Sequence, residues 1–198
     1  TIQGEIKVRL ASNGEKITTL DAQERKLNSS DLIIADTNEA MCIAGIIGSS
    51  KHGVSKSTSR ILLESAFFNP VSVRKSAKRH GLSTDASFRF ERQVDPNMVK
   101  AAAERAAELI CEWSGAKVVG VVELGETDYA TGFKVDLSWD TLDNMIGSQL
   151  DRTHVKSILE ALDIEVCSED ADAMKLLVPA YRSDVTRPAD VVEEVLRI

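Results

Sequence analysis

The first third of the chain carries short apolar stretches of the kind that form β-strands. Ile6, Val8 and Leu10 alternate with polar residues, which places them on one face of an extended segment. Further along, β-branched residues and apolar runs bounded by polar residues or glycine are typical of buried strands. The pattern predicts strands at residues 6–10, 16–20, 31–36, 41–47 and 60–68, with a loop over residues 48–53.

Two helices are predicted by the residues at their ends. A capping residue followed by proline favours a helix start, and glycine favours a helix end. These signals lie at Asn69-Pro70 and Gly81 for the first helix, and at Asp95-Pro96 and Gly115 for an alanine-rich second one. A turn of small residues over 80–87 is expected to lead from the first helix into a strand. We also predict a strand at residues 117–124 and a linker at residues 125–132.

Past residue 132 the pattern changes to short amphipathic helices around a hairpin. Val155, Ile158 and Leu159 share one face of a predicted helix. We predict helices at residues 139–146, 153–162 and 190–198, and a hairpin of residues 164–166 with 174–178. The chain is therefore expected to be α+β. It would comprise a mixed-sheet domain over residues 1–125 and a small helix-helix-hairpin-helix domain over 127–198, winged-helix-like and of a nucleic-acid-binding kind.

Composition is that of a folded protein with a core. Of the 198 residues, 43% are hydrophobic and 28% are charged, which excludes a disordered or low-complexity chain. No apolar run approaches the roughly 20 residues that a membrane-spanning helix needs, so we expect no membrane segment. The chain starts with Thr1 and no basic-then-apolar leader follows, so we expect no signal peptide. Three cysteines far apart in sequence favour free thiols and a cytoplasmic location.

The net charge of −7 argues against a general nucleic-acid binder, but the charges are unevenly distributed. Residues 70–95 contain six basic and only three acidic side chains. Within this stretch, Arg89 and Arg92 alternate with Phe88 and Phe90. Such a pattern fits either contact with a phosphate backbone or aromatic residues that belong to the core.

Glu64 is an acidic residue inside the apolar run of residues 62–68. Burying an ionised carboxylate without a partner costs roughly several kcal/mol, so a buried Glu64 would need a partner for its charge. Two interpretations stay open. The side chain either lies on the solvent face and pairs with an arginine, or it points into a pocket and accepts a hydrogen bond from a ligand. The turn at residues 80–87 is likewise either an ordinary helix exit or a place where backbone amides approach a substrate closely.

Four carboxylates lie close together near the C-terminus. A helix that begins near Asp190 places Glu193 and Glu194 on the same face as Asp190, and Asp184 precedes it. Clustered carboxylates suit magnesium or calcium. Alternatively, acids at a helix start simply interact with the positive end of the helix dipole. The sequence has no histidines at metal-binding spacing, no nucleophile motif and no phosphate-binding glycine loop.

The residues around Glu64 closely resemble the beta subunit of bacterial phenylalanyl-tRNA synthetase. The resemblance extends through essentially the whole chain, in the order and with the spacing of that family. The segments that carry it are AGIIG at residues 44–48, LLESAFFNP at 62–70, RHGLSTDAS at 79–87, RFERQVDP at 89–96, PAYRSD at 179–184 and VEEVLRI at 192–198.

The resemblance implies that the first domain is an editing domain, which hydrolyses mischarged tyrosyl-tRNA(Phe). Glu64 is then the acid that recognises the tyrosine hydroxyl, and the pocket walls are formed by Gly48, Thr84 and Ala86. The carboxylates assigned to magnesium, at the contact with the alpha subunit, correspond to Asp184, Asp190, Glu193 and Glu194. The whole enzyme of the family is a heterotetramer of two alpha and two beta subunits that charges tRNA(Phe). It uses ATP, and the resemblance implies that this fragment does not bind that ATP.

The sequence departs from the family at several points. Ser49 follows Gly48 where the family usually has two glycines, and Gln93 stands where the family has glycine. The family's pocket also uses a histidine and an arginine upstream of the first strand, which precede the start of this chain. We therefore expect an incomplete pocket in the fragment.

The chemistry of editing is consistent with an acid in this role. A hydrophobic pocket rejects an added hydroxyl by only about 100-fold, whereas a fixed acceptor for that hydroxyl reverses the preference. We predict a part of phenylalanine-tRNA ligase that carries the proofreading site for Tyr-tRNA(Phe). The alternative is a non-catalytic scaffold for tRNA docking and alpha-subunit contact. A free-standing RNA-binding module is the least favoured option because of the net charge.

Overall fold

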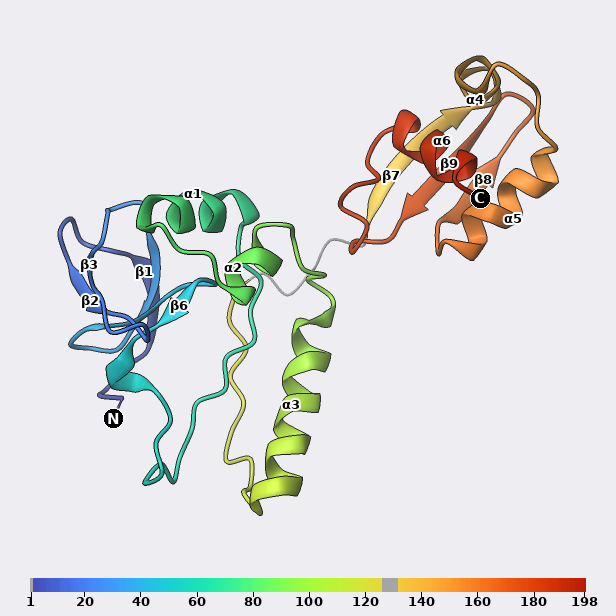
Figure 1. Cartoon of the computed structure of the whole chain (residues 1–198). Coiled ribbons are helices and arrows are strands. Elements are labelled where there is room, and N and C mark those ends of the chain that lie inside the picture. The colour runs from blue at the N-terminus through green and yellow to red at the C-terminus, as the bar shows by residue number, and fades with distance from the viewer. Residues whose placement is uncertain (1, 126–131) are drawn as a thin grey trace. The chain divides into compact units, whose positions relative to one another are not determined.

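The structure is a computed structural model that describes residues 2–125 and 132–198 (Figure 1). Contacts between residues divide the chain into two units. The first unit comprises Thr1–Val94 and Val99–Ala116, and the second comprises Asp95–Met98 and Lys117–Ile198.

The first unit starts with six short strands: β1 (Lys7–Leu10), β2 (Lys16–Thr18), β3 (Glu24–Lys26), β4 (Leu32–Ala35), β5 (Ala40–Ile43) and β6 (Ile47–Gly48). Four of them form an antiparallel sheet in the order β1-β4-β5-β6, and β2 pairs with β3. Ile33 of β4 lies opposite Ile43 of β5, and both are buried. The apolar runs of the sequence thus become the centre of the sheet.

The helical elements of this unit are η1 (Ser50–His52), α1 (Pro70–His80), α2 (Asp85–Phe90) and α3 (Met98–Ser114). The start and end signals of α1 are confirmed. The Asn69 side chain accepts the Ser72 N–H at 3.0 Å, and Gly81 adopts the left-handed conformation with φ +63°. Val73 and Ala77 of α1 are buried in the core under the sheet.

A buried carboxylate fastens α1 to the strand region. The Asp31 side chain is fully buried, and one of its oxygens accepts the Ser76 hydroxyl at 2.7 Å. Its other oxygen lies 2.7 Å from the His80 Nε2, and the Arg79 guanidinium pairs with the carboxylate as well. Since these three side chains belong to α1, one acidic side chain fixes the helix relative to β4.

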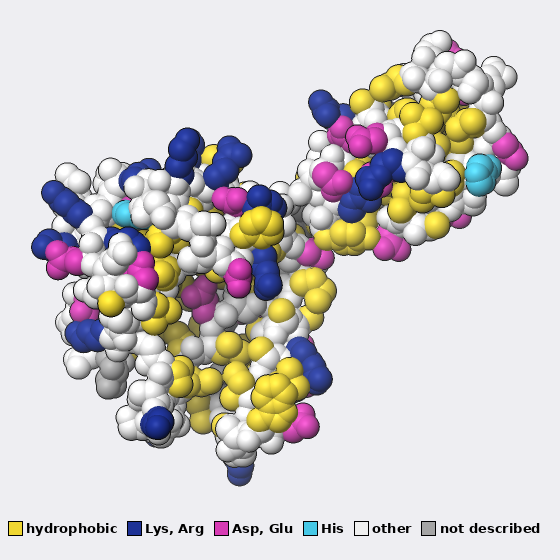
Figure 2. All heavy atoms as spheres, in the orientation of Figure 1, with side chains coloured by type: hydrophobic (Ala, Val, Ile, Leu, Met, Phe, Trp, Pro, Cys, Tyr) yellow, Lys and Arg dark blue, Asp and Glu magenta, His cyan; other side chains and the backbone are white. Residues whose placement is uncertain are grey.

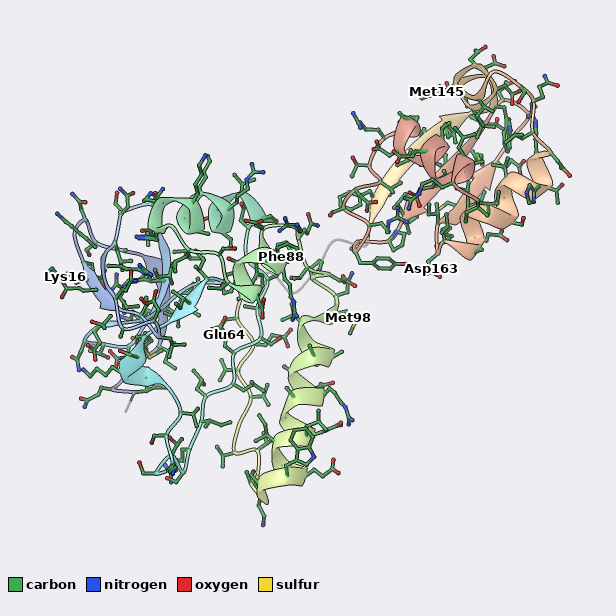
Figure 3. All side chains as sticks on the ribbon, viewed as in Figure 1. Lys16, Glu64, Phe88, Met98, Met145 and Asp163 are labelled. Atoms are coloured by element: carbon green, nitrogen blue, oxygen red, sulfur yellow. The ribbon has the colours of Figure 1, made fainter. Side chains whose placement is uncertain are left out.

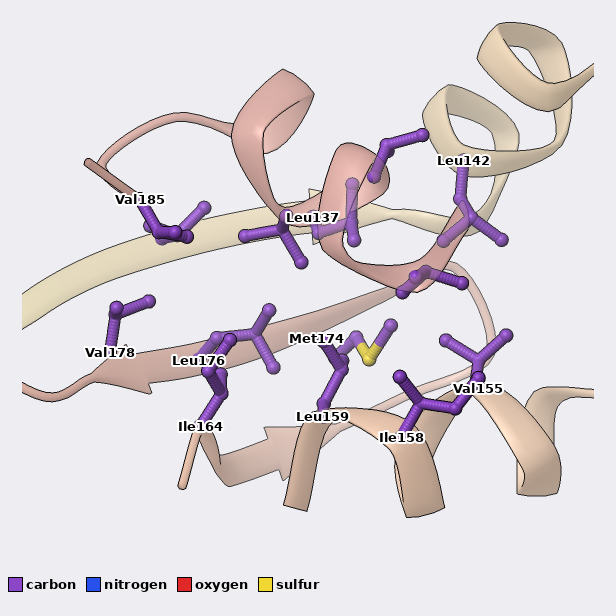
Figure 4. Packing of buried hydrophobic residues seen from close by; sticks show 14 of the residues in the cluster. Leu137, Leu142, Val155, Ile158, Leu159, Ile164, Met174, Leu176, Val178 and Val185 are labelled. Carbon is purple, nitrogen blue, oxygen red and sulfur yellow. The ribbon is translucent and has the colours of Figure 1, made fainter. Parts of the chain in front are cut away.

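The second unit has a complete core of its own. Its sheet has the order β7-β9-β8 and is antiparallel, and three helices pack on it. The elements are β7 (Phe133–Ser138), α4 (Trp139–Ile146), α5 (Arg152–Ala161), β8 (Glu165–Glu169), β9 (Ala173–Val178) and α6 (Pro188–Leu196). Figure 4 shows Leu137, Leu159 and Met174 among the side chains that meet in this core, and all three are fully buried.

Two predicted strands are wrong. Residues 60–68 and residues 117–124 contain no strand, although both are rich in apolar residues. Leu62 is 56% exposed and Val119 is fully exposed. A strand requires a hydrogen-bonded neighbour, and neither segment pairs with any strand in the part of the chain that the structure describes. The apolar runs indicated burial, and most of their residues are exposed, although Phe68 at the end of the first run is buried.

Other differences are local. The strand predicted at 41–47 is interrupted by a turn at Gly45, whose φ is +68°. The predicted loop at 48–53 contains η1, and the strand expected after residues 80–87 is the helix α2. Strands β3 and β7 were not predicted, and the expected mixed sheet is antiparallel in every described pairing.

The helix-helix-hairpin-helix order of the second unit is confirmed, with β7 added in front of it. Its winged-helix-like, nucleic-acid-binding character stays a prediction. The predicted boundary between residues 125 and 127 also stays a prediction, because residues 126–131 of the linker lie outside the described residues. No helix in the described ranges combines the length and the apolar character that crossing a membrane requires.

Candidate functional site

The turn between β5 and β6 is where two of the predicted site residues come together. Gly48 of β6 lies opposite Cys42 of β5 in the sheet. The Thr84 hydroxyl donates a hydrogen bond of 2.7 Å to the Ile46 carbonyl oxygen in the turn. A side chain from the start of α2 is therefore held within two residues of Gly48.

Local sequence explains why α2 starts at this point. Thr84 and Ser87 form a reciprocal cap, in which the Thr84 hydroxyl accepts the Ser87 N–H at 3.0 Å and the Ser87 hydroxyl caps the Thr84 N–H at 2.9 Å. Two N–H groups at the helix start are satisfied in this way, so the short helix is stable at its first turn. Ala86 lies in that first turn and is exposed. It therefore shares the element of Thr84, without a described contact to Glu64.

Gly45 permits the turn itself. Its φ is +68°, and a Cβ atom placed there would approach the Phe68 ring to 2.9 Å. The ring of Phe68 packs edge-to-face on Phe90 of α2, with centroids 5.1 Å apart. A side chain at position 45 would thus displace the aromatic pair that joins the turn, α2 and the end of the 60–68 segment. By contrast, a Cβ at Gly48 would meet only Leu20, at 3.6 Å.

Glu64 lies on the irregular segment that leads into α1, and Figure 3 shows it in the region between β6 and α3. The next residue anchors the segment, because the Ser65 hydroxyl donates to the Val99 carbonyl of α3 at 2.7 Å. Glu64 is exposed, as one interpretation expected, but the arginine partner of that interpretation is wrong. Within the described ranges no hydrogen bond or ion pair involves its carboxylate.

The electrostatics of Glu64 link it to the same turn. Although Glu64 is exposed as a whole residue, neighbouring parts of the protein partly exclude water from its carboxyl group, and this desolvation raises the pKa of Glu64. Burial raises the pKa of the Cys42 thiol to about 12, and the negative charge of Glu64 adds to that effect. The carboxylate therefore acts on the residue that pairs with Gly48. It also follows that Cys42 remains a thiol at neutral pH and is unsuitable as a nucleophile.

All three cysteines are free, and Cys42 and Cys111 are half-buried while Cys167 is exposed. The prediction of free thiols is confirmed.

Ser49 and His52, directly after Gly48, were not predicted as part of the site. The Ser49 hydroxyl lies 2.8 Å from His52 Nδ1, and His52 Nε2 lies 4.0 Å from an Asp36 oxygen. The residue types are those of a catalytic triad. However, Ser49 is only 5% exposed, and its hydroxyl also accepts the His52 N–H as the cap of η1. We interpret the cluster as a structural support behind Gly48.

The four C-terminal carboxylates do not gather around a common point. Arg182 lies between Asp184 and Glu194, with N–O distances of 2.8 Å and 2.9 Å. Arg187 pairs with Asp190 at 2.7 Å. In the described ranges, no group of three histidine, cysteine, aspartate or glutamate residues could hold a metal ion.

Three of the four acids are thus already neutralised by arginines, whereas Glu193 is exposed. In this arrangement they do not fit magnesium, and no catalytic step is assigned to it. The assignment of these four residues to magnesium stays a prediction.

The contacts that build the site had little signal in the sequence. The bonds from Thr84 to the Ile46 carbonyl and from Ser65 to the Val99 carbonyl end on backbone atoms, whose positions no residue type reveals. A Thr-x-x-Ser cap at residue 84 was the one local signal available, and it would also have identified α2.

Comparisons with known proteins match two domain families, one to each part of the chain. Residues 1–115 match the family described as B3/4 domain, and residues 135–198 match the family described as tRNA synthetase B5 domain.

Several relatives at the sequence level carry the name phenylalanine–tRNA ligase beta subunit. The chain is 41% identical over 195 residues to that of Bacteroides fragilis, covering 98% of this chain and 24% of the relative. It is 43% identical over 197 residues to that of Porphyromonas gingivalis, with the same coverage. It is 44% identical over 198 residues to that of Pseudoalteromonas translucida, covering 100% of this chain and 25% of the relative. The chain thus spans about a quarter of the length of these relatives.

Among solved structures, an N-terminal fragment of the phenylalanyl-tRNA synthetase beta subunit from Pyrococcus horikoshii is similar with a TM-score of 0.48 and 19% identity. That similarity covers 98% of this chain and 56% of the fragment.

Proposed function

The chain belongs to the B3/4 domain family, and from this membership we propose that it is the proofreading part of a phenylalanine–tRNA ligase beta subunit. The B5 domain match behind it and the names of the relatives support the same assignment. The whole cytoplasmic enzyme, with an alpha subunit, would charge tRNA(Phe) using ATP and magnesium. This chain would contribute the site that hydrolyses mischarged Tyr-tRNA(Phe).

The observation that carries the proposal is an acid without a partner beside the β5–β6 turn. Glu64 has a raised pKa and no described hydrogen-bond donor, so its oxygens are basic and available. A tyrosine hydroxyl would satisfy them. A phenylalanine ring in the same place would exclude water from the carboxylate and offer nothing in return, at a cost of about 1–3 kcal/mol. The site would therefore favour the mischarged amino acid.

Two further residues would shape the pocket in which hydrolysis takes place. A Cβ atom at Gly48 would make only an ordinary contact with Leu20, at 3.6 Å, and Thr84 fixes the start of α2 against the turn. Hydrolysis would break the ester between the amino acid and the ribose, with water adding to the carbonyl carbon and the ribose oxygen leaving as a hydroxyl. An aminoacyl ester is already activated, so a positioned water can suffice without a protein nucleophile. This agrees with the protonated state of Cys42.

The test is deacylation of Tyr-tRNA(Phe) by the full-length beta subunit assembled with its alpha subunit. Glu64→Ala should slow this hydrolysis by about 5- to 150-fold, which corresponds to one lost hydrogen bond to a charged acceptor. Glu104→Ala, which removes an exposed acid on α3, is the matched control and should leave the rate unchanged. Equal rates for both variants would remove Glu64 from the mechanism.

The scaffold alternative is supported by the apolar side chains of the 60–68 segment. Ile61, Leu62 and Leu63 are exposed, as expected of residues that contact another part of an assembly. Under this alternative, Glu64→Ala leaves deacylation unchanged, whereas polar substitutions at these three positions weaken assembly with the alpha subunit. The two outcomes are separable in the same preparation by size-exclusion chromatography.

A further inference from the structure

The exposed side of α1 carries cations that the fold does not use. Arg74, Lys75 and Lys78 are exposed, and none of them has a hydrogen bond or ion pair from its side chain within the described ranges. The neighbouring Arg79 differs, since it pairs with buried Asp31. Helix α1 contains no acidic residue. The chain as a whole has a net charge of −7, so these three side chains form a local excess of positive charge that no described ion pair neutralises.

Helix α2 adds an exposed aromatic ring beside these cations. Phe88 is 55% exposed, and the guanidinium carbon of Arg92 lies 3.7 Å from the centre of its ring. The Arg92 guanidinium is held there by a 2.9 Å bond to the Phe88 carbonyl and by its pair with Glu91. Phe90 faces the other way and packs in the core against Phe68. The two aromatic residues of this stretch therefore have different roles, and only Phe90 is a core residue.

The two features belong to one surface of the first unit. Helices α1 and α2 pack against each other, and Figure 2 shows basic side chains gathered over this part of the molecule. Phe88 lies one helical turn after Thr84, which corresponds to about 6 Å along the axis. The exposed ring is therefore carried by the same short helix that begins at the candidate site, and the cations lie on the helix packed against it.

We propose that Arg74, Lys75 and Lys78 of α1, with Phe88 and Arg92 of α2, form the surface that binds the single-stranded 3′ end of a tRNA. The cations would contact the phosphates, and the Phe88 ring with its stacked guanidinium would support an unpaired base. Single-stranded nucleic acid is bound in this general way, by a basic track combined with aromatic stacking. The inference rests on the proposed function only in the choice of tRNA as the RNA.

The charge part is tested with the 198-residue chain and a fluorescein-labelled acceptor-stem hairpin of tRNA(Phe) that carries its single-stranded 3′ end. Binding is followed by fluorescence anisotropy between about 50 and about 300 mM salt, because phosphate contacts weaken steeply with salt over this range. Lys75→Glu with Lys78→Glu should weaken binding at least about 10-fold and lower the salt slope by about 1.4, the value for two lost single-strand phosphate contacts.

The matched control is Lys26→Glu with Lys56→Glu, which changes the charge equally at two exposed positions outside α1 and α2. Its affinity should stay close to that of the unaltered chain. Thermal melting of both double variants shows whether either has lost its fold. The proposal is overturned if the two pairs weaken binding equally, or if the unaltered chain does not bind the hairpin.

The stacking part is tested at Phe88 with the same hairpin. Phe88→Leu keeps an apolar side chain without an aromatic face and should weaken binding by about 5- to 100-fold, whereas Phe88→Trp should retain it. A blunt hairpin that lacks the single-stranded end should bind all three proteins equally. Equal binding of the complete hairpin by the Leu and Trp variants would overturn the stacking role.

These results are independent of the editing test. Glu64→Ala should leave hairpin affinity unchanged, because Glu64 is neither a cation nor part of this surface. If Glu64→Ala has no effect on deacylation while Lys75 and Lys78 still determine hairpin binding, the editing proposal fails and the RNA surface stands.

Discussion

The two units use their apolar residues in different ways. In the second unit every helix contributes buried side chains to one core, with Leu142 of α4, Leu159 of α5 and Val191 of α6 fully buried. In the first unit α3 is the longest helix, at 17 residues, and it has no buried residue. Apolar content alone therefore does not indicate where a chain is stable.

The difference bears on function because the candidate site lies in the first unit, whose longest helix has no buried residue. Its parts are joined by a few specific contacts, including the Thr84 bond to the turn and the Asp31 cluster under α1. We expect substitutions in the second unit to act mainly on global stability. Substitutions at the contacts of the first unit should act on the site with smaller changes in stability.

The largest expected effect is a cavity in the core of the second unit. Leu159→Ala removes a fully buried side chain and should lower the free energy of unfolding by about 3–5 kcal/mol. Ile110→Ala, at a half-buried position of α3, should cost less than about 1 kcal/mol. Urea unfolding followed by circular dichroism measures both. Similar losses at the two positions would show that α3 is as closely packed as α5, and the contrast between the units would fail.

The next effect concerns Asp31. Asp31→Asn removes the charge of the side chain and keeps its shape, and should lower the free energy of unfolding by about 2–3 kcal/mol. This is less than the roughly 3–5 kcal/mol lost when a fully buried ion pair is broken, because the Arg79 side chain is 35% exposed. Asp136→Asn, at an exposed position of β7, is the control and should be neutral.

The pH dependence of the same variant has a definite sign. Burial on its own would raise the pKa of Asp31, but hydrogen bonds from the Asn28 N–H, Ser76 and His80 bring this pKa below its usual value. A lowered pKa means that the stabilisation is complete above about pH 4 and is lost as the pH falls further. The difference in melting temperature between native chain and variant should therefore shrink from pH 5 to pH 2. A constant difference over this range would exclude the carboxylate charge as its cause.

Two glycines of the β5–β6 turn allow a sharper comparison within the site. Gly45→Ala places a Cβ 2.9 Å from the Phe68 ring at a φ of +68°, and should cost about 1–3 kcal/mol. Gly48→Ala meets only Leu20 at ordinary contact distance, so its stability should be unchanged. If Gly48 lines the editing pocket, this variant should nevertheless slow Tyr-tRNA(Phe) deacylation. Loss of stability at Gly48 with none at Gly45 would contradict the described turn.

The smallest expected effect has the opposite sign. Desolvation raises the pKa of Glu64, so the charged carboxylate is held at a cost to stability. Glu64→Gln should leave the protein equally stable or more stable at pH 7, by no more than about 0.5 kcal/mol. The gain should vanish below about pH 4, where Glu64 is protonated in the folded and unfolded chain. Destabilisation at pH 7 would indicate that Glu64 has a structural partner.

Much of the fold was predictable because its signals are local. The Asn-Pro start and glycine end of α1 need only neighbouring residues, and both are confirmed. The segments 60–68 and 117–124 were mispredicted because a strand depends on a distant partner that no local pattern reveals. Helix α2 was missed because its cap uses serine at the position where glutamate is the familiar signal.

The candidate site was predictable only in part for the same reason. The pattern identified Glu64 as an unusual acid, yet it left open whether an arginine neutralises it. Phe88 and Phe90 look equivalent in the sequence, and only the three-dimensional packing separates the core ring from the exposed one.

The state of Cys42 has a consequence for how the protein withstands oxidants. The thiolate is the form of cysteine that reacts with peroxides and alkylating reagents, and the half-buried Cys42 thiol, with its pKa of about 12, offers almost none. Cys167, exposed on β8, is reached first by any such reagent. A chemical label can therefore be attached to the second unit without altering the sulfur that lies opposite Gly48.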